Sequence, residues 1–154
     1  MVTDYIALGL ICPTSGLALN VDSGECNATA SFAAVASDNC GISSTGVTYA
    51  IGSNPISFPY DFPVGSTTVT SSVTDVNGNT TTCNFTVVVT DNIAPGLICP
   101  TTGLALNVDA GECNATASFT AVDSDNCPTP PAAVTYAIGS NTITFPYDFP
   151  VGST

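Results

Sequence analysis

The sequence predicts an all-β chain of two tandem β-sandwich domains, and three features lead to this prediction. Apolar residues alternate with Ser, Thr and Asn in short segments, which is typical of half-buried strands. Gly, Pro and Asn mark turns between these segments, and no segment sustains a helical period of about 3.6 residues. The chain also repeats itself without a gap, which indicates that the same domain occurs twice.

The internal repeat has a constant offset of 87 residues, so that the "ICP" beginning at Ile11 returns at Ile98. Residues 1–67 align with residues 88–154 with 52 identities in 67 positions. We therefore expect a first domain over residues 1–89 and a second over residues 90–154 that lacks its last two strands. The main divergent block, 41–46 against 128–133, predicts a tolerant loop.

Roughly seven short strands are predicted in a full unit, which is typical of an immunoglobulin-like sandwich. The clearest segments are residues 6–12, 17–21, 26–36, 47–51, 68–75 and 81–89. Asn77-Gly78 predicts a type I′ hairpin between the last two strands. The "FPYDFP" at 58–63, with its flanking prolines, predicts a loop.

The first "FPYDFPVGST" continues into the predicted hairpin of residues 68–89, whereas the second ends the sequence at Thr154. A sandwich without its final hairpin exposes sheet edges and core. We expect either a longer continuous array, which we favour, or separate subunits that complete one another's sheets by β-strand addition. Both arrangements predict head-to-tail self-association into a filament.

The cysteines predict structural disulfides and an oxidising compartment, because no His partner and no Cys-x-x-Cys pair suggests a metal site. Four cysteines in a full unit allow three pairings. The expected arrangement is Cys12–Cys26, Cys40–Cys83 and, by repetition, Cys99–Cys113, with Cys127 unpaired within the chain.

Charge and composition exclude several classes of function. The chain has no Lys, Arg or His and twelve acidic residues, for a net charge of −12. Such a surface repels phosphate backbones and anionic lipids, so we expect no nucleic-acid partner, and without an apolar run of membrane-spanning length we expect no membrane insertion. An enzyme needs groups that move protons or stabilise developing charge, and without Lys, Arg or His this chain has only carboxylates, tyrosines and cysteines for these roles. We therefore expect no enzyme and no required cofactor.

Two kinds of binding site are candidates. Glycan attachment is predicted at four N-x-S/T sequons: Asn27, Asn79, Asn84 and Asn114. Ca²⁺ is a candidate ligand of acidic residues near the junction of the repeats and in the two "SDNC" segments: Asp4, Asp91, Asp38 and Asp125. The "DVNGN" at 75–79 resembles the start of a Ca²⁺ loop, but a hairpin turn explains it better.

The combination of "TDNIAPGLICP", "DNC" and "FPVGSTTVTSSVTDVNGNTTTCNFTVVVTD" resembles the hyalin repeat (HYR) family over essentially the whole chain. The first unit departs from the pattern by reading "DYIALGLICP", without the proline that stands at Pro95. The resemblance implies extracellular or cell-surface immunoglobulin-like modules in tandem. The predicted function is a glycosylated structural subunit of an extracellular filament. The alternative is the stalk or binding module of a cell-surface adhesin that depends on Ca²⁺.

Overall fold

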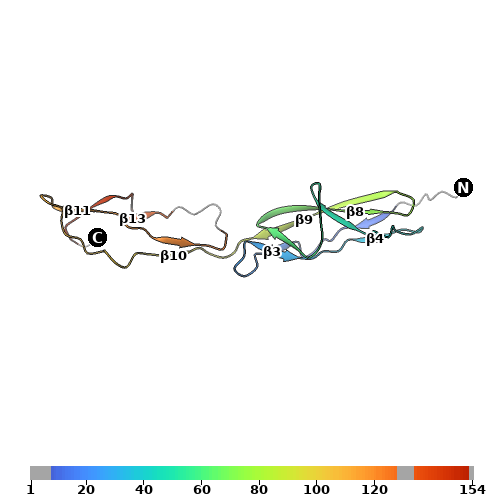
Figure 1. Ribbon diagram of the computed structural model, residues 1–154, viewed down its shortest axis with the longest axis horizontal. Coiled ribbons are helices and arrows are strands. Elements are labelled where there is room, and N and C mark those ends of the chain that lie inside the picture. Colours follow the sequence, from blue (N-terminus) through green and yellow to red (C-terminus); the bar gives the residue numbers. More distant parts are fainter. Residues whose placement is uncertain (1–7, 128–133, 153–154) are drawn as a thin grey trace. The chain divides into compact units, whose positions relative to one another are not determined.

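The computed structural model describes residues 8–127 and 134–152 and divides the chain into two compact units, residues 1–92 and 93–154 (Figure 1). The described residues form strands and no helix, which confirms the predicted all-β class. Asp4 and the predicted loop at 128–133 lie outside the described residues.

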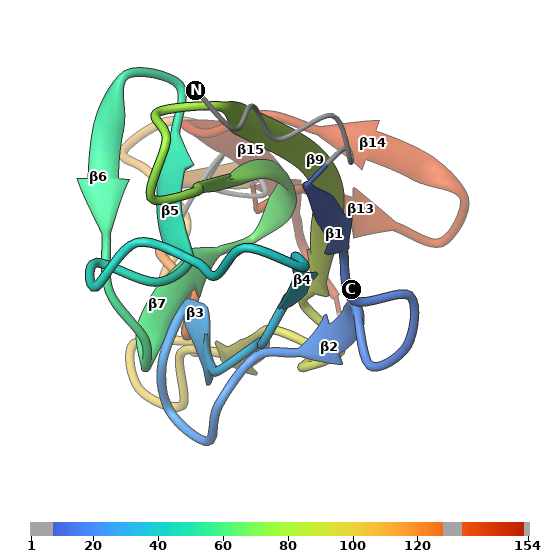
Figure 2. The ribbon, with the colours of Figure 1, turned by 90° about the vertical axis from the view of Figure 1, so that its right-hand side faces the viewer.

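Unit 1 is built around one sheet of five strands in the order β2-β9-β8-β5-β6 (Figure 2). Two further antiparallel pairs, β1–β4 and β3–β7, complete the described part of the unit. The strands are β1 (Gly9–Ile11), β2 (Ala18–Asn20), β3 (Asn27–Ala30), β4 (Val35–Ser37), β5 (Thr48–Ile51), β6 (Asn54–Ile56), β7 (Tyr60–Pro63), β8 (Gly65–Thr74) and β9 (Thr80–Thr90). This arrangement is consistent with the predicted sandwich.

The long hairpin of β8 and β9 supplies most of the core of unit 1. Its inward side chains alternate along both strands, as the sequence predicts, and Val69, Val73, Phe85, Val87 and Val89 are at most 5% exposed. Their alternation with Thr, Ser and Asn directs one face inward and the other to solvent. Burying this many apolar side chains on one hairpin makes it the main hydrophobic contribution to the unit.

An aromatic cluster fills the space between the hairpin and the β3–β7 pair. The ring of Phe32 meets Phe58, Phe62 and Phe85 edge-on, at centroid distances of 5.8, 5.9 and 5.4 Å. Phe62 is fully buried. These geometries are the favourable ones for aromatic pairs.

The prediction that "FPYDFP" forms a loop is wrong, because Tyr60–Pro63 is strand β7. It pairs antiparallel with β3, with Ala28 opposite Phe62. The edge position of β7 leaves room for proline, which cannot donate a ladder hydrogen bond. The predicted strand over 26–36 is also divided, since β3 and β4 are separate strands that pair with β7 and β1.

The hairpin between β8 and β9 occurs where it was expected, but its turn is not type I′. A type I′ turn needs a positive φ at both central residues. Only Gly78 has one, at 92°, and no described residue other than glycine does. Asp75 organises this turn instead: its Oδ1 accepts hydrogen bonds from the backbone N–H groups of Asn77 and Asn79, each at 2.8 Å.

Unit 2 repeats six strands of the first part of unit 1, those equivalent to β1 and β3–β7. Its described strands are β10 (Gly96–Ile98), β11 (Asn114–Ala117), β12 (Val122–Ser124), β13 (Tyr136–Ile138), β14 (Asn141–Ile143) and β15 (Tyr147–Pro150). Their registers match those of unit 1 at the offset of 87, so that Ala115 lies opposite Phe149 as Ala28 lies opposite Phe62. The described residues of unit 2 form no counterpart of β2, β8 or β9.

Candidate functional site

The two units differ in the core-facing side of one strand pair. This pair is β3–β7 in unit 1 and β11–β15 in unit 2. In unit 1 this side lies under the β8–β9 hairpin, and Val21, Ala28 and Phe62 are buried there. In unit 2 the equivalent residues border an open groove of about 450 Å³. We call this groove the apolar face of unit 2; its main residues are Leu104, Leu106, Val108, Ala115, Phe119 and Phe149.

The apolar face exposes large side chains that unit 1 covers. Leu104, Leu106 and Val108 are 57%, 44% and 52% exposed. At the matching positions of unit 1, Leu17 and Leu19 are half-buried and Val21 is buried. A contiguous exposed apolar surface of this kind is typical of an interaction site.

The aromatic part of the face already has the geometry of the covered site. Phe119 meets Phe145 and Phe149 at centroid distances of 5.8 and 5.7 Å, close to the 5.8 and 5.9 Å of the equivalent pairs in unit 1. The Tyr136–Phe145 pair, at 4.7 Å, likewise matches a pair at 4.8 Å in unit 1. The aromatic rings of unit 2 therefore keep the arrangement that they have in unit 1.

Polar contacts hold the strands under this face in place. Asp109 Oδ2 accepts a hydrogen bond from the Thr116 backbone N–H at 2.9 Å, and the Thr116 hydroxyl donates to Asp148 Oδ1 at 2.7 Å. The Ala121 N–H donates to the Tyr136 hydroxyl at 3.0 Å. All three bonds recur in unit 1 at the offset of 87 residues. The β11–β15 pair is thus a complete copy of β3–β7.

The structure corrects the expected disulfides of unit 1, because it joins Cys12 to Cys83 with a Cα–Cα distance of 6.0 Å. The expected bonds Cys12–Cys26 and Cys40–Cys83 are therefore both wrong. The physical reason is that β1 lies against β9, where the Thr81 hydroxyl donates to the Leu8 carbonyl at 3.0 Å. This contact places the residue after β1 beside the last strand.

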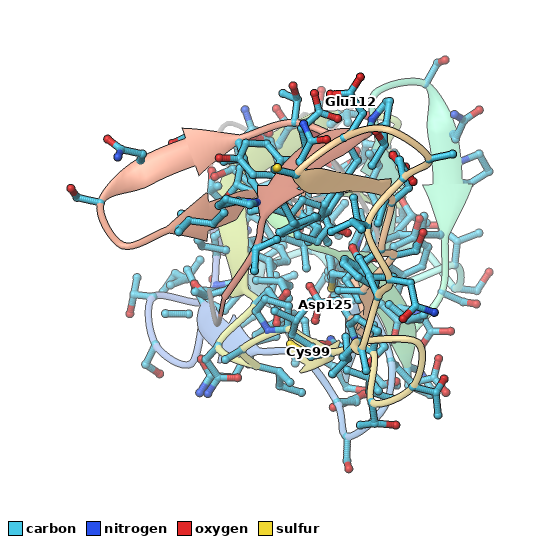
Figure 3. All side chains as sticks on the ribbon, turned by 90° about the vertical axis from the view of Figure 1, so that its left-hand side faces the viewer. Cys99, Glu112 and Asp125 are labelled. Carbon is cyan, nitrogen blue, oxygen red and sulfur yellow. A yellow bond between two sulfur atoms is a disulfide. The ribbon has the colours of Figure 1, made fainter. Side chains whose placement is uncertain are left out.

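The cysteines of unit 2 also differ from the prediction. Cys99, which follows β10, and Cys113 are free, exposed thiols, so the expected bond between them is wrong (Figure 3). Cys127 is disulfide-bonded, which contradicts the expectation that it is unpaired. Cys99 is the counterpart of Cys12, so the residue that unit 1 ties to its last strand is a thiol in unit 2.

The four sequons lie in different environments. Asn84, on β9, is exposed, whereas Asn27 and Asn114 are half-buried at the starts of β3 and β11. Asn79 is exposed, but its Nδ2, the atom to which a glycan would be attached, donates to Asp75 Oδ2 at 2.6 Å. Glycosylation stays a prediction, and Asn84 has the most suitable position.

The acidic residues do not converge in the part of the chain that the structure describes. Glu112 and Asp125 lie apart (Figure 3), and no three His, Cys, Asp or Glu side chains gather there as a metal site requires. Asp38 Oδ2 accepts the Cys40 N–H, and its Oδ1 is buried without a hydrogen-bond partner. Ca²⁺ binding by Asp38, Asp91 and Asp125 stays a prediction.

Asp75 is the acidic residue whose environment is most specific. Burial acts to raise the pKa of its carboxyl, but hydrogen bonds from the Asn79 side chain and from the backbone of Asn79, Asn77 and Gly78 outweigh this effect and lower the pKa. Because those bonds use both carboxylate oxygens, the group stabilises the turn. This supports a hairpin turn over a Ca²⁺ loop at 75–79.

A family model, the HYR domain, matches residues 10–89, which is just over half of the chain. The chain therefore belongs to the HYR domain family, as its motifs indicated. HYR domains are extracellular repeat modules, and the family is not catalytic. No curated protein and no solved structure matches the chain. Within the described residues no helix is long and apolar enough to cross a membrane.

Proposed function

We propose that the chain is a structural subunit of an extracellular filament, built from tandem HYR-type repeats that associate head to tail and carry glycans. The observation that carries this proposal is the exact repetition of the strand registers of unit 1 in unit 2. Repetition of one body at a fixed offset is how a chain extends in one dimension.

The solvent face of the β8–β9 hairpin supports a structural role. It is lined by uncharged hydroxyl side chains, and the Thr68–Thr86 and Thr74–Thr80 hydroxyl pairs lie 3.4 and 2.9 Å apart. Asn84 stands in the same exposed row. Such a face offers N-linked and O-linked attachment points, and a glycan coat would keep a chain with only 8% charged residues in solution.

Electron microscopy and intact-mass measurement of the native material test the proposal. We expect filaments, and a mass above 15.4 kDa that falls on glycosidase treatment but persists after reduction. Particles that stay single at every concentration would overturn the filament. An unchanged mass after glycosidase treatment would contradict the proposed glycans but not the proposed filament.

A further inference from the structure

We propose that Asn77 is a site of spontaneous deamidation, and that isoaspartate formed there releases Ile42 and Ser43 from the β8–β9 turn. Deamidation is a covalent modification that needs no enzyme: the backbone nitrogen of the next residue attacks the side-chain amide, which ends as a carboxyl. The site lies within unit 1 and is independent of the proposed filament.

The residue that follows Asn77 favours this reaction. It is Gly78, and no other asparagine in the chain is followed by glycine. Glycine has no side chain to obstruct the approach of its nitrogen to the neighbouring amide. Asn79 and Asn84, the other asparagines of the hairpin, precede a threonine and a phenylalanine. Attack on the side-chain amide is therefore least hindered at Asn77.

The side chain of Asn77 is free to turn toward that nitrogen. The residue is exposed, and the hydrogen bond that it makes comes from its backbone N–H, which donates to Asp75 Oδ1 at 2.8 Å. The amide of Asn79 is held instead, because its Nδ2 donates to Asp75 Oδ2 at 2.6 Å. The turn therefore fixes one of these two side-chain amides and leaves the other able to react.

The attacking nitrogen is also weakly held. The Gly78 N–H donates to the Asp75 carbonyl at 3.3 Å, which is the longest of the hydrogen bonds between residues 75 and 79. A hydrogen bond of this length is weak. The space where a side chain of residue 78 would stand is open. Freeing the Gly78 nitrogen for attack therefore breaks only the weakest bond of the turn.

The reaction consumes water and releases ammonia, without oxidation. Solvent base removes the Gly78 amide proton, and the nitrogen attacks Cγ of Asn77. The N–Cγ bond forms as the Cγ–Nδ2 bond breaks, and ammonia leaves with a proton from solvent. Water then opens the cyclic imide at either carbonyl. Opening at the side-chain carbonyl gives aspartate, whereas opening at the main-chain carbonyl gives isoaspartate, in which the backbone runs through the former side chain.

Isoaspartate at this position disturbs more than the turn itself. Asp75 forms an antiparallel bridge with Ile42, and the Ser43 N–H donates to the Thr74 carbonyl at 2.9 Å. The bridge depends on a turn in which Asp75 Oδ1 accepts two backbone N–H groups. Isoaspartate adds a carbon to the backbone between these two groups, so the carboxylate can no longer accept both. The turn and its contacts with Ile42 and Ser43 therefore open together.

The experiment ages the oxidised 154-residue chain at mildly alkaline pH, which favours loss of the amide proton. Trypsin has no Lys or Arg to cleave after, so the aged chain is reduced and cut with chymotrypsin after Tyr60 and Phe85. We expect the peptide 61–85 to gain about 1 Da at Asn77 and to be labelled by an isoaspartate-specific methyltransferase. Amide exchange at Ser43 should become roughly tenfold faster in the isoaspartate form, as loss of one hydrogen bond to a carboxylate implies.

Two variants separate the steps. Asn77→Gln should not convert, because its longer side chain must close a larger ring. Freshly prepared Asn77→Asp adds the same negative charge without lengthening the backbone, so exchange at Ser43 should stay slow. Conversion of Asn79 or Asn84 as fast as Asn77 would overturn the site, and so would an unchanged Asn77 after a time in which a free peptide of residues 74–80 converts. Slow exchange at Ser43 in the isoaspartate form, or equally fast exchange in Asn77→Asp, would overturn the proposed release.

Discussion

Replacing Cys12 and Cys83 together by serine should destabilise unit 1 by about 4 kcal/mol. The two cysteines are 71 residues apart in the sequence. A cross-link closing a loop of that length removes about 15 cal/mol/K of entropy from the unfolded chain, which is about 4 kcal/mol at 25 °C. Since small domains are stable by about 5–15 kcal/mol, this loss would leave unit 1 marginal.

Urea unfolding followed by far-UV circular dichroism measures the loss, with the oxidised wild-type chain as reference. Cys99→Ser is the matched control, because Cys99 occupies the same position of the repeat but forms no bond. We expect that variant to unfold within about 0.5 kcal/mol of the wild type, as exposed substitutions usually do. A loss below about 1 kcal/mol in the double variant would refute the loop-entropy reasoning. An equal loss in Cys99→Ser would show that the two positions do not differ.

Three further predictions concern single side chains. Phe62→Ala should lower the free energy of unfolding by about 3–5 kcal/mol, as for a fully buried phenylalanine. Phe149→Ala should lower it by less than half as much, because the site of Phe149 is open. The urea midpoints of the two variants measure the difference. Asp75→Asn should make the free energy of unfolding depend less steeply on pH in the acid range. The lowered pKa of Asp75 stabilises the fold above the unfolded value of about 3.9, and this stability is lost as pH falls through the folded value; an unchanged slope between wild type and variant would contradict it. Under the proposed glycosylation, Asn84→Gln should lower the intact mass of the native material by one glycan, whereas an unchanged mass would show that Asn84 carries none.

The faces of the long hairpin could be predicted from the sequence because side-chain alternation is a local property. A period of two over residues 68–75 predicts that Val69 and Val73 share one face, and both are buried. The position of the hairpin followed from Asn77 and Gly78 for the same reason. The turn type did not, because the Asp75 carboxylate competes for the backbone donors of the loop.

The disulfides could not be predicted from spacing because their partners are set by tertiary contacts. Cys12 lies closer in sequence to Cys26 than to Cys83, yet it bonds to Cys83. The parallel pairing of β2 with β9 carries the start of the unit to its last strand, and no local pattern encodes such a contact.

The identical Ala-Leu-Asn segments at 18–20 and 105–107 show what decides strand formation in this chain. The first is strand β2 and pairs with β9, whereas the second is irregular in a unit whose described residues contain no such partner. Intrinsic propensity cannot separate them, since it is the same for both. A three-residue strand has few hydrogen bonds of its own, so its conformation is stabilised by the neighbour that it pairs with. It follows that structure cannot be transferred from one repeat to the next by sequence identity alone.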